Sequence, residues 1–225
     1  GVDKAIAQAN SGLKLKKLWL KANFYYMDYT NQLVLTGELN DVGSSIRTNV
    51  DKSYRTGIEV EGTFLISKKV ALNANATFSQ NKIENFTEVL YDYTTDFDVI
   101  ENSYTNTDIA FSPNVIAAAS IHYSPIKQVN LMVQTKYVGK QFLDNTSNNN
   151  RAIAAYQTVD ARISFILLPK KMKELSFHLM VNNIFDTMYS SNGYTYSYIY
   201  EDLITENFYY PQAGTNFLVG LVLKF

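Results

Sequence analysis

The amino-acid sequence of 225 residues contains no cysteine and no long apolar run. The first absence excludes disulfides, zinc–cysteine sites and cysteine nucleophiles. The second excludes a membrane-spanning helix, which needs about 18 consecutive apolar residues. It leaves open a membrane β-barrel, because a barrel carries its lipid-facing residues at every second position. Net charge is also nearly absent, with 20 basic against 21 acidic residues, so the chain lacks the electrostatic signature of nucleic-acid binding.

The sequence is instead rich in aromatic residues set in alternating patterns. The clearest pattern is the C-terminal stretch 213–225, where apolar residues such as Phe217 and Leu221 alternate with small or polar ones such as Gly220 and Lys224. Alternation with a period of two predicts a β-strand. A strand of this length is long enough to cross a bilayer, which needs about 9 to 11 residues. One apolar face that ends on an aromatic residue is typical of a strand in a membrane barrel.

The same alternation recurs along the chain and predicts about eight strands. They are expected at 18–27, 54–66, 70–79, 115–123, 129–137, 159–167, 175–182 and 213–225. The fold class is therefore all-β, a transmembrane antiparallel β-barrel, and 18–225 is its barrel portion. Residues 1–17 form an N-terminal segment to which the sequence assigns no role.

The connections between these strands alternate between short and long. The short ones, at 67–69, 124–128 and 168–174, are rich in lysine, whereas long loops are expected at 37–52, 83–111 and 187–212. Outer-membrane barrels have short periplasmic turns and longer extracellular loops. We therefore expect the last strand to run towards the periplasm, and residues 1–12 to start at that same end.

An inside-out arrangement, with apolar residues inside as in a lipocalin-like carrier, is the rival interpretation. Two features favour the membrane barrel. The polar face combines charged residues with glycines such as Gly57 and Gly220, which suits an interior crowded by packed protein. The apolar face carries aromatic residues near the strand ends, including Tyr54 and Phe225, as the two aromatic girdles of a membrane protein do.

Several stretches, in order and spacing, resemble the C-terminal part of TonB-dependent outer-membrane receptors. They are residues 23–29 with 31–33, residues 53–61, Ser112-Pro113-Asn114, residues 181–186 ahead of Tyr189, and Tyr210-Pro211 ahead of the terminal strand. The resemblance spans about residues 18–225. It implies a 22-stranded barrel in the bacterial outer membrane, surrounded by outer-membrane lipid, of which this chain supplies roughly the last eight strands.

The resemblance also implies a function and partners. Members of this family import large, scarce ligands such as iron-siderophores, haem, cobalamin or glycans, and they receive energy from TonB through an N-terminal plug inside the barrel. The sequence contains neither a plug nor a TonB box, so we expect the remaining strands and the plug to come from a second chain or from a missing part. The alternative is a self-contained eight-stranded outer-membrane barrel with an adhesive or structural role.

The expected loop 83–111 is a candidate calcium site. Between Glu84 and Asp108 it carries seven acidic residues and no basic one, and Asp96, Asp98 and Glu101 form the tightest group. Calcium prefers several carboxylate and carbonyl oxygens. The spacing does not match the calcium-loop pattern, so a solvated acidic loop is the alternative.

The expected loop 187–212 is rich in tyrosine and is a candidate ligand contact. Four of its tyrosines are two residues apart, so an extended strand would present them on one face, with Asn192-Gly193 as the hairpin turn. Rigid amphipathic rings suit a large planar or sugar-like ligand at the barrel mouth, and stacking between loops is the alternative. The candidates are Tyr189, Tyr194, Tyr196, Tyr198, Tyr200, Tyr209 and Tyr210.

Four charged residues at strand positions opposite the apolar face are candidates for contact with the plug, because charges there must be paired or hydrated, and contact with the ligand is the alternative. They are Arg55, Glu59, Glu61 and Arg162. The two histidines, His122 and His178, lie on different expected strands without a carboxylate at metal-ligand spacing. No catalytic motif is visible, so we expect a protein that is not an enzyme.

Overall fold

The computed structural model describes residues 2–14, 16–39, 45–169 and 172–225, and these ranges contain strands and no helix. Accordingly, no helix in the described ranges is suited to crossing a membrane. The strands are β1 (Val2–Lys14), β2 (Leu18–Leu39), β3 (Ser45–Leu65), β4 (Val70–Asp92), β5 (Asp98–Asp108), β6 (Val115–Ile126), β7 (Val129–Val138), β8 (Gln141–Phe142), β9 (Ala152–Ile153), β10 (Tyr156–Leu167), β11 (Glu174–Asn182), β12 (Ser190–Tyr200), β13 (Asp202–Pro211) and β14 (Asn216–Lys224).

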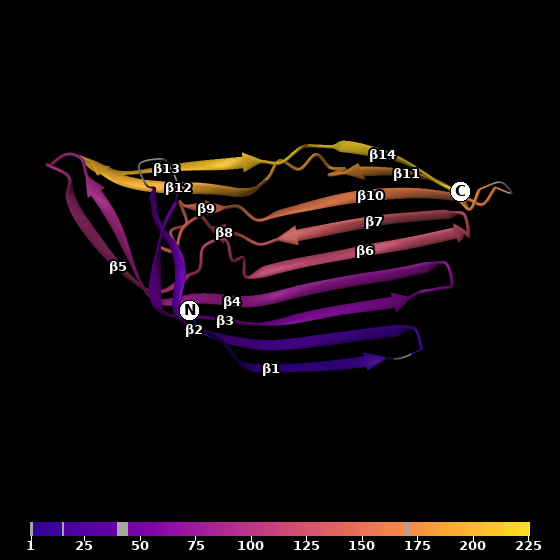
Figure 1. The fold of residues 1–225 in the computed structure, drawn as a ribbon, viewed down its shortest axis with the longest axis horizontal. Helices are drawn as coiled ribbons and strands as arrows, with labels where there is room; N and C mark the ends of the chain where they lie inside the picture. The colour runs from indigo at the N-terminus through magenta and orange to yellow at the C-terminus, as the bar shows by residue number, and fades with distance from the viewer. Residues whose placement is uncertain (1, 15, 40–44, 170–171) are drawn as a thin grey trace.

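One antiparallel sheet with the order β1-β2-β3-β4-β6-β7-β10-β11-β14 forms the body of the molecule. Its strands lie side by side along the longest axis, and β5, β12 and β13 gather at one end (Figure 1). Within the described residues β1 pairs only with β2, and β14 only with β11, so the sheet is open at both edges. This open path of nine strands does not form the self-contained eight-stranded barrel that the sequence left as an alternative.

Each of the eight expected strands is present, and β1 is an additional one. The segment 1–17, to which the sequence assigned no role, supplies β1, in which Val2 pairs with Thr30 and Lys14 with Trp19. Strand β1 therefore begins at the end that carries the long connections, while the C-terminus lies at the opposite end (Figure 1). The expectation that the chain starts at the short-turn end is wrong.

The short turns lie together at one end of the sheet, as predicted. Adjacent turns are joined by backbone hydrogen bonds, in which the amide of Leu65 donates to Lys17 O at 2.8 Å and the amide of Ser124 donates to Lys69 O at 2.8 Å. At the other end the expected loops 37–52, 83–111 and 187–212 are largely strand. Strands β2, β3 and β4 have 22, 21 and 23 residues, about twice what a bilayer crossing requires, so they extend well beyond the crossing segment.

The two faces of the sheet differ as the alternation predicts. Val60 lies opposite Ala22 on β2 and Ala76 on β4, so apolar residues share one face across neighbouring strands. This face is exposed: Phe217 is 74% and Leu221 63% accessible. The apolar residues do not converge on a buried centre, as they would in a soluble carrier.

The buried core lies instead at the long-connection end of the molecule. It comprises Val34, Val50, Ile83, Phe86 and Ile109, which come from β2, β3, β4 and the residue that follows β5. Burial of such side chains stabilises a structure by about 1.5 to 3 kcal/mol each. The long-connection end thus has a small packed core of its own, whereas the described residues form no such core in the body of the sheet.

The final strand is shorter than predicted because the residues ahead of it are held by the connection after β11. Strand β14 has nine residues. The amide of Thr215 donates to Asp186 Oδ1 at 2.9 Å, and the Thr215 hydroxyl donates to Asn183 O at 2.7 Å. Asn183, with φ 50°, donates in turn to Thr187 O and Ala213 O. These contacts give the 181–186 motif a structural role: it anchors the start of β14.

Candidate functional site

The long-connection end of the sheet is formed by two hairpins and a short two-stranded sheet. Hairpin β4–β5 meets hairpin β12–β13 through a parallel bridge between Asp92 and Ile199, and the amide of Tyr93 donates to Ile199 O at 2.8 Å. The amide of Glu201 donates to Thr94 Oγ1 at 2.7 Å. The tips of both hairpins are therefore fixed to each other (Figure 1).

Hairpin β12–β13 presents an aromatic ladder on one face. The ladder consists of Tyr194, Tyr196, Tyr198, Phe208 and Tyr210. Ring centroids of Tyr194 and Phe208 are 4.8 Å apart with an interplanar angle of 9°, and those of Tyr196 and Phe208 are 6.1 Å apart, also at 9°. Parallel offset rings at these spacings attract one another, so the ladder is a rigid aromatic surface.

The extended tyrosine strand was predicted correctly, but its turn was not. Asn192 and Gly193 lie inside β12, next to a bulge, and pair with Tyr210 and Tyr209. The hairpin turns at Glu201, which has φ 63°. An Asn-Gly pair favours a two-residue turn, but here Gly193 meets a tertiary need, because an added Cβ would lie 3.2 Å from Leu143 Cδ2 and 2.4 Å from Phe208 O.

The remaining candidate tyrosines have other settings. Tyr189 stacks on Tyr156 at 4.4 Å between centroids, the Tyr209 hydroxyl donates to Ala152 O at 3.1 Å, and Tyr200 is 58% exposed at the hairpin tip. The structure thus gathers four of the seven candidates into the ladder and leaves Tyr189, Tyr200 and Tyr209 outside it. Whether any of the seven contacts a ligand stays a prediction.

Glu206 ties the ladder together by accepting two phenol hydrogen bonds, from Tyr196 at 2.6 Å and from Tyr198 at 3.3 Å. The bond to Glu206 raises the pKa of Tyr196 to about 12, because the carboxylate stabilises the protonated phenol and repels the phenolate. The pKa of Tyr198 is also raised, by partial desolvation and by the Glu206 charge. Both phenols therefore keep their protons at neutral pH and hold fixed orientations.

A buried ion cluster lies beneath the hairpins. Arg151, which follows the 143–150 turn, binds Glu88 of β4 and Asp144, the latter at 2.9 Å between Nη1 and Oδ2. All three residues are at most 4% exposed. The Tyr104 hydroxyl of β5 donates to the second oxygen of Glu88 at 2.9 Å. The cluster thus ties the connection between β8 and β9 to hairpin β4–β5.

Burial and neighbouring charges both shift the pKa values of Arg151 and Tyr104. Burial alone would lower the pKa of Arg151, but hydrogen bonds to Glu88 and Asp144 outweigh it and raise that pKa. For Tyr104, burial and the Glu88 carboxylate act together and raise the pKa to about 12. Arg151 therefore keeps its positive charge and Tyr104 its proton at neutral pH.

The 143–150 turn is also fixed by its amide side chains. Asn145 is fully buried; its Oδ1 accepts the Ala110 amide at 2.8 Å, and its Nδ2 donates to Leu35 O at 2.7 Å. The opposite face of hairpin β12–β13 covers this turn, since Asn207 Nδ2 donates to Asn150 O at 2.8 Å. The aromatic ladder therefore rests on a fixed base.

The candidate calcium residues do not gather into a site. Asp98 opposes Asp92 and Glu101 opposes Val89 in hairpin β4–β5, while Asp96 lies in the tip. In the described ranges, no group of three or more His, Asp or Glu side chains is placed to hold a metal ion. Calcium binding by these residues stays an untested prediction without support from the geometry.

Three of the four candidate plug contacts have partners within the sheet. Glu59 accepts from Asn23 Nδ2 at 2.9 Å, and Glu61 pairs with Lys21 at 3.1 Å. Arg55 Nη1 donates to Asn81 Oδ1 and to Ser112 Oγ, both at 3.0 Å. All of these partners lie on the face opposite the exposed apolar one, and the contact of Arg55 explains Ser112 in the quoted motif.

Arg162 differs from the other three. It is an exposed residue of β10, placed between Met132 and Met180 of the neighbouring strands, and it forms no hydrogen bond or ion pair to any described residue. Nearby, His178 Nδ1 lies 2.9 Å from Ser164 Oγ. Arg162 is therefore a charge on this face that is free to meet an external partner.

The Arg151–Glu88–Asp144 cluster was not anticipated from the sequence. Glu88 was noted only as one of several acidic residues, and its partner lies 63 positions away. The sequence does contain one indication of an ion pair: the expected loop 83–111 carries a long series of acidic residues, and Arg151 is the first arginine after it. That signal did not indicate which carboxylate would be paired.

The family is shown by comparison with known protein families. The family model described as "TonB dependent receptor-like, beta-barrel" matches residues 7–184. Since this is well over half of the chain, the chain belongs to the TonB-dependent receptor β-barrel family, whose members are transporters and not enzymes. No curated protein matched the sequence.

Solved structures agree in fold. The siderophore receptor PiuA from Acinetobacter baumannii matches 97% of this chain with 28% of its own length, at 16% identity and a TM-score of 0.67. The copper transporter OprC matches 97% with 31% of its own length, at 14% identity and a TM-score of 0.67. The ferric citrate transporter FecA matches 97% of this chain with 30% of its own length, at 18% identity and a TM-score of 0.63. The chain thus spans less than a third of each of these proteins.

Proposed function

We propose that this chain forms the C-terminal barrel portion of a TonB-dependent transporter in the bacterial outer membrane, which imports a large, scarce ligand. The observation that carries the proposal is the division of the sheet into two faces. Apolar residues such as Phe217 and Leu221 are fully displayed on one face, while Glu59, Glu61 and Arg55 form polar contacts on the other. An exposed apolar face of this extent needs hydrocarbon around it.

The polar face of the sheet is proposed to contact the plug. The unpaired Arg162 is the strongest candidate, because its guanidinium can donate two parallel hydrogen bonds to a carboxylate of the plug. Further contacts with the plug are proposed for Glu59, Glu61 and Arg55, whose side chains are already held by partners in the sheet. TonB would act on the transporter through that plug.

The aromatic ladder is proposed to contact the ligand at the outer mouth of the barrel. The rings of Tyr194, Tyr196 and Phe208 are held nearly parallel by stacking, and Glu206 fixes the Tyr196 phenol, so little conformational entropy is lost on binding. Flat rings of this kind suit a ligand with planar or sugar-like surfaces, a class that includes iron-siderophores, haem, cobalamin and glycans.

An uptake assay tests the proposed function. Cells that lack the gene are compared with cells that lack TonB, using labelled ferric siderophore, haem, cobalamin and oligosaccharide. We expect uptake of one ligand class to fall in both strains and to return when the intact gene is restored. Unchanged uptake of the whole panel, or a loss that does not depend on TonB, would contradict the proposal.

A further inference from the structure

A groove of about 510 Å³ crosses the exposed apolar face of β1, β2, β3 and β4 near their short-turn ends. Its floor is formed by small residues from three neighbouring strands, Ala22, Gly62, Ala74 and Ala76. Gly62 leaves room for Leu20 at the floor, because an added Cβ would lie 2.7 Å from Leu20 Cδ2 and would push that side chain aside. The groove is therefore built into the packing of the sheet.

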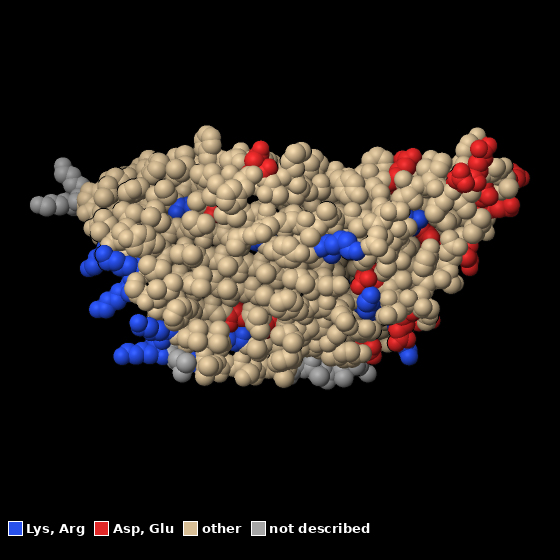
Figure 2. Space-filling model, turned by 180° about the vertical axis from the view of Figure 1, so that it is seen from behind, with Lys and Arg blue, Asp and Glu red and all other residues tan. Residues whose placement is uncertain are grey.

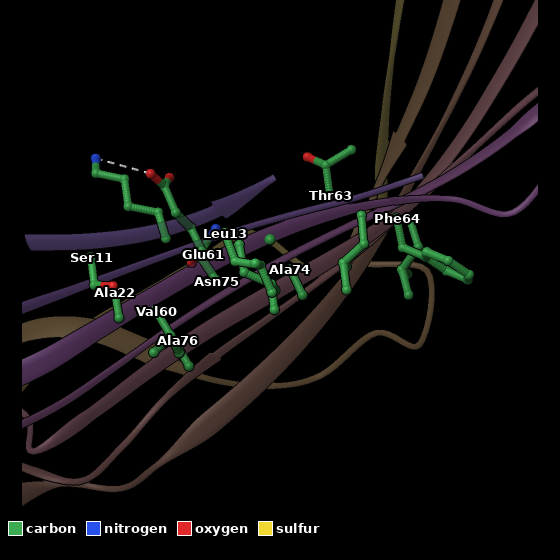
Figure 3. Close-up of a pocket in the computed structure, with 15 residues that line it drawn as sticks. Ser11, Leu13, Ala22, Val60, Glu61, Thr63, Phe64, Ala74, Asn75 and Ala76 are labelled. Atoms are coloured by element: carbon green, nitrogen blue, oxygen red, sulfur yellow. Dashed lines mark ion pairs between the residues drawn. The ribbon is translucent and has the colours of Figure 1, made fainter. Parts of the chain in front are cut away.

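Cross-strand rows of apolar side chains border the groove, with the largest at the end near the turns. On the side of the turns, Leu18, Phe64 and Leu72 form one cross-strand row, and on the other side Ala22, Val60 and Ala76 form another. In Figure 3, Val60 and Ala76 project from one side of the sheet and Glu61 projects from the other, so the groove opens only on the apolar side. Its walls offer methyl and methylene groups to an occupant.

The turns that border the groove are basic. Lys16 and Lys17 precede β2, Lys68 and Lys69 precede β4, and all four side chains are exposed. No acidic residue occurs in 12–22 or in 62–76, the segments that surround the groove's turn-side end. Figure 2 shows basic side chains at this end of the molecule and clusters of acidic side chains at the opposite end.

An apolar groove that ends at a group of lysines matches a molecule with a hydrocarbon chain and an anionic head. We propose that this surface binds one anionic glycerophospholipid of the periplasmic leaflet, with an acyl chain in the groove and the phosphate at Lys16, Lys17, Lys68 and Lys69. Lysines at a membrane surface each attract anionic lipid by an amount equivalent to about a fivefold gain in affinity. The inference rests on the outer-membrane location proposed above.

Native mass spectrometry of the intact transporter tests this site. The delipidated protein is titrated with phosphatidylglycerol or with phosphatidylcholine of the same acyl composition. We expect one phosphatidylglycerol to be retained with clear preference. Lys68→Gln/Lys69→Gln should weaken that binding about 25-fold, at roughly fivefold for each lysine, and Ala74→Leu/Ala76→Leu should abolish it by filling the groove.

Two matched variants serve as controls. Lys173→Gln removes an exposed lysine at a different turn, and Ala161→Leu enlarges an apolar-face residue of β10 away from the groove; both should retain the lipid.

Equal retention of the two lipids, or unchanged retention in the groove and lysine variants, would overturn the proposed site. Ligand uptake by the same variants is measured separately, and normal uptake would leave the proposed function standing even if the lipid site is overturned. If the protein is absent from the outer-membrane fraction, the proposed function and the lipid site both fail.

Discussion

At the scale of single residues, the buried ion cluster is the most constrained feature of the molecule. Arg151 compensates two carboxylates that pair with no other cation among the described residues, and all three groups are withdrawn from water. Removal of one partner from a buried pair costs about 3 to 5 kcal/mol, because an uncompensated charge is left behind. The connection between β8 and β9 therefore depends on a single arginine.

Substitution Arg151→Met should release this connection locally. We expect hydrogen exchange of backbone amides in 143–153 to accelerate about a hundredfold or more, measured by mass spectrometry on the intact protein. Lys140→Gln is the matched control, since Lys140 contacts Asn149 and the Phe142 ring at the surface and takes no part in the buried cluster. If Arg151→Met exchanged as slowly as the parent protein, the cluster would not hold the connection.

The pKa of Tyr104 gives a second prediction at this scale. Its folded-state pKa of about 12 exceeds the ordinary value of 10.0, so the phenol contributes stability that is complete below pH 10 and is lost as the pH rises towards 12. In ¹³Cζ-tyrosine NMR, the resonance that disappears in Tyr104→Phe should titrate near pH 12. Titration of that resonance near pH 10 would show that the phenol is not held by burial and Glu88.

At the scale of elements, the connection after β11 decides where β14 begins. Asn183 has a positive φ, and its side chain accepts the Thr187 amide and donates to Thr187 O and Ala213 O. Asn183→Ala should lower the free energy of unfolding by about 2 to 4 kcal/mol, from lost hydrogen bonds and from backbone strain. Asn183→Gly should recover only the strain component.

Urea unfolding of the intact protein in lipid vesicles measures both variants. Because the two substitutions remove the same hydrogen bonds, the difference between them isolates the backbone contribution. Equal stability of both variants and the parent protein would contradict the assigned role of the 181–186 motif.

Hairpin β12–β13 carries a prediction about binding. Tyr196→Leu should weaken the affinity for the imported ligand about 2- to 12-fold, since a stacked aromatic contact contributes about 0.5 to 1.5 kcal/mol. Tyr123→Leu, on the exposed apolar face near a short turn, is the control and should not change the affinity. Isothermal titration with the ligand identified by uptake measures both, and an unchanged affinity in Tyr196→Leu would remove the ladder from the binding site.

The sequence predicted the elements whose structure depends on local alternation, and it failed where distant partners decide. Strands β3 and β14 were recognised because every second residue is apolar. Hairpin β4–β5 was taken for a loop because its residues are polar, yet its backbone groups are satisfied by strand pairing and its side chains by partners such as Arg151. The Asn192-Gly193 pair was misread because its tertiary contacts with β13 outweigh its turn preference.

At the scale of the whole molecule, the sheet has two open edges. Neither β1 nor β14 has a second neighbour among the described residues. Unpaired strand edges lead to aggregation in water and cannot be satisfied in lipid. These edges are the places where further strands of a larger barrel would attach.

Refolding into detergent tests this property. The 225-residue chain alone should aggregate, whereas a protein that supplies the remaining strands should refold into a species that migrates faster when unheated. A monomeric, heat-modifiable species formed by this chain alone would contradict the open sheet.

The central claim is that the apolar face of the sheet meets hydrocarbon. These 225 residues contain no cysteine, so single cysteines introduced along β3 can carry spin labels in the intact protein in lipid vesicles, with any cysteine elsewhere replaced by serine. Labels at Ile58, Val60 and Phe64 should collide frequently with oxygen and rarely with a water-soluble nickel chelate, and labels at Glu59, Glu61 and Thr63 should not show this oxygen-dominated pattern. Protection of Ile58, Val60 and Phe64 from both reagents, or greater access of nickel than of oxygen to them, would contradict the account.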